Sequence, residues 1–327
     1  MSTQAIAMLT TVALTIALLP ITTLAQTPPS TFPTKPVRLI VPFPPGGATD
    51  IIGRLVAQKM TEVWGQAVIV ENKPGAGTVV GTQAMAKAAP DGYTLGVVIT
   101  AHVINPSLRS EMPYDTLKDL AGVTQLAQAH LALMAHPSFA ANTVAELIEL
   151  ARKNPGKFAY GSPGSGTAMH LGMEMLKSRT AIDLVHIPYK GGAPALQDVL
   201  GGNLPLLTDV LYASMPQVKA GKLKVIALMS PTRPASSPEW PVIAETVPGV
   251  SALSMIGVVA PAGTPRALLQ KISADIAAAV KSSDLTRKMA ELGMEPIGST
   301  PEQYDALVRS EIEKWARVVK DSGAKVD

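Results

Sequence analysis

The sequence predicts an α/β protein whose mainly parallel sheets are covered by helices on both faces. Short, nearly continuous apolar segments alternate with amphipathic helical segments, which is typical of parallel strands buried on both faces. Two glycine-rich loops, at residues 41–50 and 160–167, each stand between a predicted strand and a predicted helix. The length of 327 residues is sufficient for two domains.

In the first part of the chain, each predicted strand is followed by a helix or a loop. The helix over 49–64 has apolar residues at spacings of three and four, so one of its faces is buried. A turn at 72–77 separates the second strand from the second helix. Strands are predicted at 37–41, 68–70 and 95–100, and helices at 49–64 and 78–88.

The same alternation returns in the rest of the chain. Asn142 and Thr143 cap the first of these helices, and Pro265 and Pro301 suit the first turn of two later ones. Residues 230–248 contain five prolines and predict a long surface connection. Strands are predicted at 158–160, 184–187, 206–208, 225–228 and 254–259. Helices are predicted at 142–153, 167–177, 193–200, 265–282, 284–292 and 301–320. One more helix follows the strand at 206–208 and ends at 218.

The composition argues against several classes of protein. The 28 lysine and arginine residues nearly balance the 25 acidic ones, and aromatic residues make up only 4%, so the basic stripe of a nucleic-acid-binding protein is missing. The lack of cysteine excludes disulfides, thiolate metal sites and cysteine nucleophiles. The five histidines show no metal-ligand spacing. We therefore predict no metal site, no cofactor and no nucleic-acid partner.

The N-terminus predicts an export signal. Residues 5–19 are almost all apolar or small, and no charged side chain precedes Lys35. Thr23 and Ala25 supply small residues where a signal peptidase cleaves, so residues 1–25 are the predicted signal peptide. A retained membrane anchor is the alternative, but the apolar run is short for a span and ends at Pro20.

The two glycine-rich loops predict an anion-binding cleft. The first, 41–50, contains Gly46 and Gly47, and the second, 160–167, contains Gly164 and Gly166. Each loop places unpaired backbone N–H groups at the positive end of a helix, a geometry that suits a carboxylate or phosphate. Two such loops that face each other would bind a molecule with an anionic group at each end.

Other motifs have more ordinary explanations. The glycines of 75–81 have a dinucleotide-like pattern whose spacing is wrong by one residue. Neither Ser162 nor Ser165 has the flanking glycines of a nucleophile elbow. We therefore predict that neither serine forms a catalytic pair with His170.

Two polar residues that follow predicted strands are candidates for the cleft. His102 and Asp209 each come just after a strand, and α/β folds bind ligands at the carboxyl ends of their strands. For Asp209, a role as a cap of the following helix is an equal alternative.

Several segments, taken together and in order, are highly specific for one family. They are 41–47 with Asp50 and Arg54, 71–77, 91–95, 113–115, 160–171, 186–192, 220–223 and 260–265. With these segments the chain, from about Pro33 to its C-terminus, resembles the substrate-binding receptors of tripartite tricarboxylate transporters, often called Bug receptors.

The resemblance implies a two-domain periplasmic binding protein fold (type II-like) that closes over its ligand by a hinge. Domain 1 would comprise 34–128 and 252–327, domain 2 would comprise 129–251, and the ligand cleft would lie between them. The implied ligand-binding residues are Phe43, Pro44, Gly46, Gly47 and Ala48 in the first loop, Ser162, Gly164, Ser165, Gly166 and Thr167 in the second, and Thr100, Ala101, His102 and Asp209 in the remaining wall.

The resemblance also implies a function. The chain would be a monomeric periplasmic receptor that delivers a small carboxylate ligand to a membrane permease with large and small subunits. Two alternatives stay open at this point. One is an exported hydrolase that uses Ser165 and His170. The other is a ligand sensor with no role in transport.

Overall fold

The computed structural model describes residues 32–324 of the chain. The predicted signal peptide lies outside these residues. The strands are β1 (Val37–Val41), β2 (Val68–Asn72), β3 (Thr94–Ile99), β4 (Leu120–Ala135), β5 (Ala159–Ser162), β6 (Val185–Pro188), β7 (Leu206–Val210), β8 (Lys224–Leu228), β9 (Leu253–Pro261) and β10 (Met294–Pro296).

Helices separate most of these strands along the chain, so the predicted α/β class is confirmed. A 3₁₀ turn, η1 (Ala76–Thr78), follows β2. The helices are α1 (Ala48–Trp64), α2 (Val79–Ala86), α3 (Ala101–Leu108), α4 (Val144–Lys153), α5 (Ala168–Thr180), α6 (Gly192–Leu200), α7 (Leu211–Lys219), α8 (Ile243–Thr246), α9 (Arg266–Val280), α10 (Ser283–Glu291) and α11 (Pro301–Ser322).

The strands follow the order β2-β1-β3-β9-β4-β7-β5-β6, with β8 and β10 also paired to β4. The units built around β1 and β5 are parallel, as predicted: β1 pairs with β2 and β3, and β5 with β6 and β7. The pairs made by β4 and β9 are antiparallel, so the sheet is parallel only in the units built around β1 and β5.

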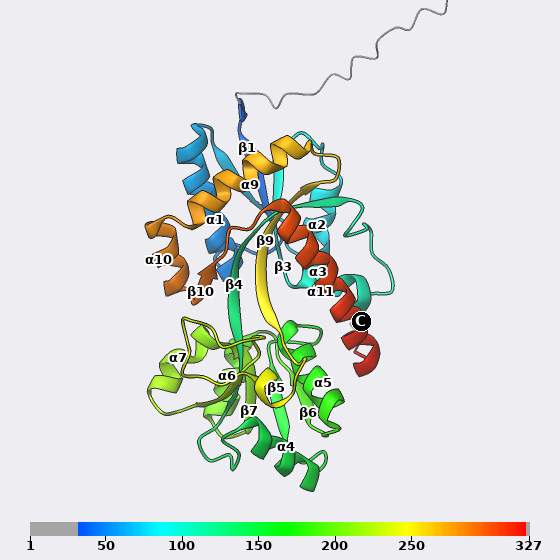
Figure 1. Cartoon of the computed structure of the whole chain (residues 1–327), viewed down its shortest axis with the longest axis vertical. Coiled ribbons are helices and arrows are strands. Elements are labelled where there is room, and N and C mark those ends of the chain that lie inside the picture. Colours follow the sequence, from blue (N-terminus) through cyan, green and yellow to red (C-terminus); the bar gives the residue numbers. More distant parts are fainter. Residues whose placement is uncertain (1–31, 325–327) are drawn as a thin grey trace, which may run out of the picture.

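The long strand β4 joins the two halves of the molecule (Figure 1). Its first part pairs with β9 as far as His130, and from Leu131 onward it pairs with β7. Figure 1 shows α1, α9 and α10 beside the first group of strands and α4 to α7 around the second. The domain boundaries near 128 and 252 stay a prediction.

The buried apolar residues form three clusters, and one of them crosses between the halves. This cluster contains Ile40 and Trp315 as well as Leu147 and Tyr160. The C-terminal helix α11 contributes to it and packs on α3, β4 and α5, so it contacts both halves. Elements from the two halves are therefore held side by side.

Helix ends agree with most of the predicted caps. The Thr143 hydroxyl accepts a hydrogen bond from the Glu146 N–H at the start of α4. Pro301 occupies the first turn of α11, behind a capping box made by Thr300 and Gln303. The prediction was wrong by one position for Pro265, which is the N-cap residue of α9. An N-cap residue needs no helical backbone angles, and proline there leaves no N–H unpaired.

Candidate functional site

The first glycine loop is fixed by a buried carboxylate. Asp50 lies in the first turn of α1, with its side chain 2% exposed. Its Oδ2 accepts hydrogen bonds from the Gly46 N–H at 2.8 Å and from Arg54 Nε at 2.9 Å. Asn72 Nδ2 donates to Asp50 Oδ1 and to the Phe43 carbonyl, both at 2.8 Å. The loop is thus tied to α1 and to the end of β2.

The charge of Asp50 is secured by these partners. Burial alone would raise the pKa of its carboxyl, but the hydrogen bonds from Arg54, the Gly46 N–H and Asn72, with the charge of Arg54, lower it to about 2. Asp50 is therefore ionised at neutral pH. It also occupies the Gly46 N–H, one of the amides that the sequence suggested for the ligand.

The second glycine loop is fixed in the same way, with an imidazole as the hydrogen-bond acceptor in place of a carboxylate. The Gly166 N–H donates to His170 Nδ1 at 3.0 Å, four residues further along the chain. Thr167 is the N-cap of α5, and its hydroxyl donates to the Gly164 carbonyl at 2.8 Å. Gly164 and Gly166 have φ values of +150° and +74°, in the region that favours glycine. The loop therefore needs glycine at these two positions.

A stack of aromatic rings supports this loop from below. The rings of His170 and His186 are stacked with centroids 3.9 Å apart, and the rings of Tyr160 and His186 are stacked with centroids 5.0 Å apart. His186 Nε2 lies 2.7 Å from the hydroxyl of Ser162, which is fully buried. Burial, with smaller effects of His170 and Lys177, lowers the pKa of His186 to about 3. Burial also lowers the pKa of His170, so both imidazoles are neutral at neutral pH and serve as structural groups.

The two halves enclose a cavity of about 310 Å³ at these loops. Six of the predicted residues line it: Phe43, Thr100, Ala101, Ser165, Gly166 and Thr167. Much of the rest of the wall is apolar and comes from Ile99, Ile104, Leu108 and Met169. The Thr100 hydroxyl accepts a hydrogen bond from the Met255 N–H at 3.0 Å, which holds the end of β3 against β9. The cavity is small, largely apolar and furnished with a few polar groups, as expected of a ligand site.

Six other predicted residues belong to the two loops but do not line the cavity. Pro44, Gly46, Gly47 and Ala48 belong to the first loop beside Phe43, and Ser162 and Gly164 belong to the base of the second.

His102 lies in the first turn of α3 but lines a different cavity, of about 210 Å³, together with Asp305. It is 3% exposed, and burial lowers its pKa to about 4, so it is neutral.

Asp209 sits at the end of β7, where it packs against the start of α6. Its Oδ2 lies 2.1 Å from the position that a Cβ would take on Gly192, and its Oδ1 accepts the Val210 N–H at 2.8 Å. The side chain makes no cap bond within α7, whose N-cap is Val210. Burial raises the pKa of Asp209 to about 6, although the Val210 bond lowers it.

Four polar residues of the cavity carry no signal in the sequence. Thr78, Asn105, Arg109 and Ser254 all line it. Asn105 Nδ2 donates to the Gly77 carbonyl at 3.0 Å and so joins α3 to the loop after β2. Arg109, which ends α3, has the one charged side chain among the lining residues. Because Arg109 belongs to no motif, the sequence does not predict its position in the cavity wall.

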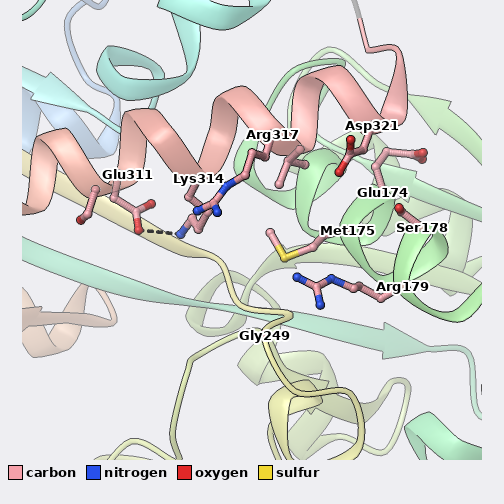
Figure 2. A pocket seen from close by; sticks show the side chains of 11 residues that line it. Glu174, Met175, Ser178, Arg179, Gly249, Glu311, Lys314, Arg317 and Asp321 are labelled. Atoms are coloured by element: carbon pink, nitrogen blue, oxygen red, sulfur yellow. Dashed lines mark hydrogen bonds and ion pairs between the residues drawn. The ribbon is translucent and has the colours of Figure 1, made fainter.

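A larger cavity, of about 380 Å³, lies between α5 and α11 (Figure 2). Side chains of both charges surround it: Arg179, Lys314 and Arg317 against Glu174, Glu311 and Asp321. Lys314 donates to Glu311 at 2.6 Å, and Arg179 and Arg317 are exposed. Balanced charge favours neither an anion nor a cation, and no glycine loop reaches this cavity. The cavity at the glycine loops is therefore the better candidate site.

Within residues 32–324, no group of three or more acidic or histidine side chains is arranged to hold a metal ion. In the same part of the chain, no helix combines the length and apolar character of a membrane span.

Comparison with known sequences points to one family. The model of the family described as "Tripartite tricarboxylate transporter family receptor" matches residues 52–324. The protein BugT of Bordetella pertussis is 34% identical over 299 residues, which are 90% of this chain and 92% of BugT.

Two solved structures share the fold. Rpa4515 of R. palustris with adipate has a TM-score of 0.77 and 34% identity, and the match covers 90% of this chain and 100% of that one. MatC (Rpa3494) from Rhodopseudomonas palustris with bound malate has a TM-score of 0.72 and 29% identity, and the match covers 88% of this chain and 100% of that one.

Proposed function

This chain belongs to the tripartite tricarboxylate transporter receptor family, and from that membership we propose that its cleft binds a small organic acid for a membrane transporter. The resemblance found in the sequence is confirmed, and the chain is a solute-binding receptor. We place it in the periplasm, where relatives such as BugD act as binding proteins. The relatives solved with adipate and malate support a carboxylate as its ligand.

The observation that carries the proposal is the cavity at the two glycine loops. Phe43 of the first loop and Ser165, Gly166 and Thr167 of the second line the same space of about 310 Å³. Amides at the N-terminus of α5 carry partial positive charge and favour a carboxylate there. The apolar wall suits the carbon skeleton of an organic acid.

A thermal-shift measurement tests the proposal. The exported protein is unfolded, washed free of ligand and refolded, and its melting temperature is then measured against mono-, di- and tricarboxylates. Ligand that binds only the folded state at 100 times its Kd stabilises the protein by about 2.7 kcal/mol. We expect a raised melting temperature with one group of acids. The absence of a shift with every acid, from a folded and ligand-free sample, would contradict the proposal.

The contacts of the two serine–histidine pairs favour binding over hydrolysis. The His170 Nδ1 atom receives the Gly166 N–H, so it is not free to activate Ser165. The Ser162 and His186 side chains do meet, but Ser162 is fully buried below the cavity wall. We therefore expect no turnover of a panel of ester substrates, and saturable hydrolysis that Ser165→Ala abolishes would support the enzyme instead.

Uptake assays on cells distinguish a receptor for transport from a receptor that only senses the acid. Cells that lack the receptor should lose uptake of the labelled acid, and cells that lack the membrane subunits should lose it equally. A receptor that only reports the acid would leave uptake unchanged when it is deleted.

A further inference from the structure

Arg109 differs from every other residue around the glycine-loop cavity because its side chain is charged. It is the C-cap of α3, and the same helix lines the cavity from Ala101 onward. Arg109 comes eight positions after Ala101, which places the two residues about 12 Å apart along the axis. The cavity therefore follows α3, with a cation at the end of the helix.

The guanidinium of Arg109 has unused hydrogen-bonding capacity. Its Nε is buried and has no hydrogen-bond partner within residues 32–324, and no carboxylate of that part of the chain lies within ion-pair distance. A buried donor without a partner costs free energy, and an unpaired charge costs more. Such a group in a ligand cavity is expected to find its partner in the ligand.

The neighbouring loop leaves room for this guanidinium. Arg109 Nη2 lies 2.8 Å from the position that a Cβ would take on Gly77, whose φ is +60°. The Gly77 carbonyl is in turn held by Asn105 Nδ2. Arg109 thus lies over a glycine backbone that is tied to its own helix, and a side chain at position 77 would collide with the guanidinium.

We propose that Arg109 binds a second anionic group of the ligand, so that the receptor selects di-acids over mono-acids of the same carbon skeleton. This inference rests on the proposed function: one carboxylate is held at the glycine loops and the other by Arg109. An arginine pairs with a carboxylate through two parallel N–H bonds, which adds direction to charge. Hydrogen bonds to charged groups predict a preference of roughly 10- to 100-fold.

Calorimetric titration with matched acids tests this assignment. Succinate, glutarate and adipate are each compared with the mono-acid of the same carbon number, on the wild type, Arg109→Gln, Arg109→Lys and the control Arg317→Gln. Arg317 is exposed and lines the other cavity. In Arg109→Gln we expect the preferred di-acid to lose roughly 10- to 100-fold in affinity while the mono-acid keeps its own. Arg109→Lys should keep part of the preference for the di-acid over the mono-acid, and Arg317→Gln should keep all of this preference.

The ligand can be changed instead of the protein, which avoids any effect on folding. The monomethyl ester of the preferred di-acid should bind the wild type as weakly as the mono-acid does. Equal binding of the ester and the di-acid, or equal losses for both acid classes in a folded Arg109→Gln variant, would overturn the role of Arg109 while leaving an acid receptor intact. Binding of no acid by the wild type would overturn the proposed function as well.

Discussion

At the residue scale, the two glycine loops share one device. In each, the N–H of a glycine is bonded to the side chain four positions later: Gly46 to Asp50 and Gly166 to His170. One acceptor is an anion and the other a neutral ring. Both bonds fix a loop to the first turn of the helix that follows it, and a loop fixed before binding loses less entropy when the ligand arrives.

The acceptor at His170 should matter for affinity. In His170→Phe the ring can still stack on His186, but the Gly166 N–H loses its partner. We expect affinity for the best acid of the panel to fall roughly fivefold, which corresponds to about 1 kcal/mol. In His170→Asn, the side-chain oxygen takes a place near that of Nδ1 and should retain most of the affinity. Calorimetry measures both, with His136→Phe as the control.

His136 lines a different cavity, and its Nδ1 accepts the Ser138 N–H. Its substitution should leave affinity unchanged. Equal affinities of His170→Phe and the wild type would show that the loop holds its shape without this bond.

Asp209 should make stability fall as the pH rises. Its pKa of about 6 in the folded state exceeds the ordinary value of 3.8, so the folded state binds more protons between these values. The stability that the protonated form contributes is present below about pH 4 and lost by about pH 6. Asp209→Asn should therefore be more stable than the wild type near pH 8, by up to about 3 kcal/mol, and the gain should shrink near pH 4.

Urea unfolding at the two pH values measures this gain. Asp183→Asn, at an exposed position in the same half, is the control and should change neither value. A stability gain of the same size at both pH values would show that the effect of Asp209→Asn does not come from titration.

At the element scale, α11 is bound to β9 by a tight contact. The ring of Tyr304 lies directly over Gly257, and its hydroxyl oxygen is 2.0 Å from the place of a Cβ. The hydroxyl is fully buried and has no hydrogen-bond partner among the described residues. The strand therefore needs a glycine here, and the tyrosine carries an oxygen that the packing does not satisfy.

Two substitutions should separate these effects. Gly257→Ala should destabilise the protein by about 1–3 kcal/mol, because the new methyl group meets a packed ring. Tyr304→Phe should be neutral or should raise the free energy of unfolding by about 1 kcal/mol, since it removes an unpaired buried polar group. Chemical denaturation measures both. A clear loss of stability in Tyr304→Phe would mean that a bound water satisfies the hydroxyl.

The sequence predicted the elements whose pattern is local and missed those that depend on distant partners. Apolar spacing predicts the helix at 49–64, a short run of β-forming residues predicts the strand at 37–41, and both are confirmed. The strand β4 was missed, because Gln125, Gln128 and His130 interrupt its apolar run. Its partners β7 and β9 come much later in the chain, so its burial could not be anticipated.

The site was predictable to the same degree. Loops such as 160–167 can be recognised from their glycines, and four residues of that loop line the cavity. The helix α3 contains Pro106 and has no side-chain cap, so its sequence does not predict a helix. The position of Arg109 at the cavity depends on this helix and was missed with it. A single arginine can be recognised as a candidate binding residue only once the fold is known to surround it with apolar residues.

At the scale of the whole molecule, the two halves surround the cavity and are joined by β4 and β9 (Figure 1). We expect these halves to close over the ligand. Small-angle scattering should then show a smaller radius of gyration when the preferred acid is added. An acid from the panel that gives no thermal shift serves as the control. A radius that does not change at saturating ligand would indicate a cleft that is rigid and already closed.

The position of β9 also bears on how the chain is made. It lies between β3 and β4, yet it follows both in the sequence and begins only at Leu253. As the chain leaves the ribosome, β3 and the first part of β4 have no strand to fill the gap between them until residue 261 is complete. An edge that stays open so long slows folding and leaves the nascent chain exposed to chaperones. We therefore expect the chain to stay unfolded, and so competent for export through the predicted signal peptide, until β9 has been made.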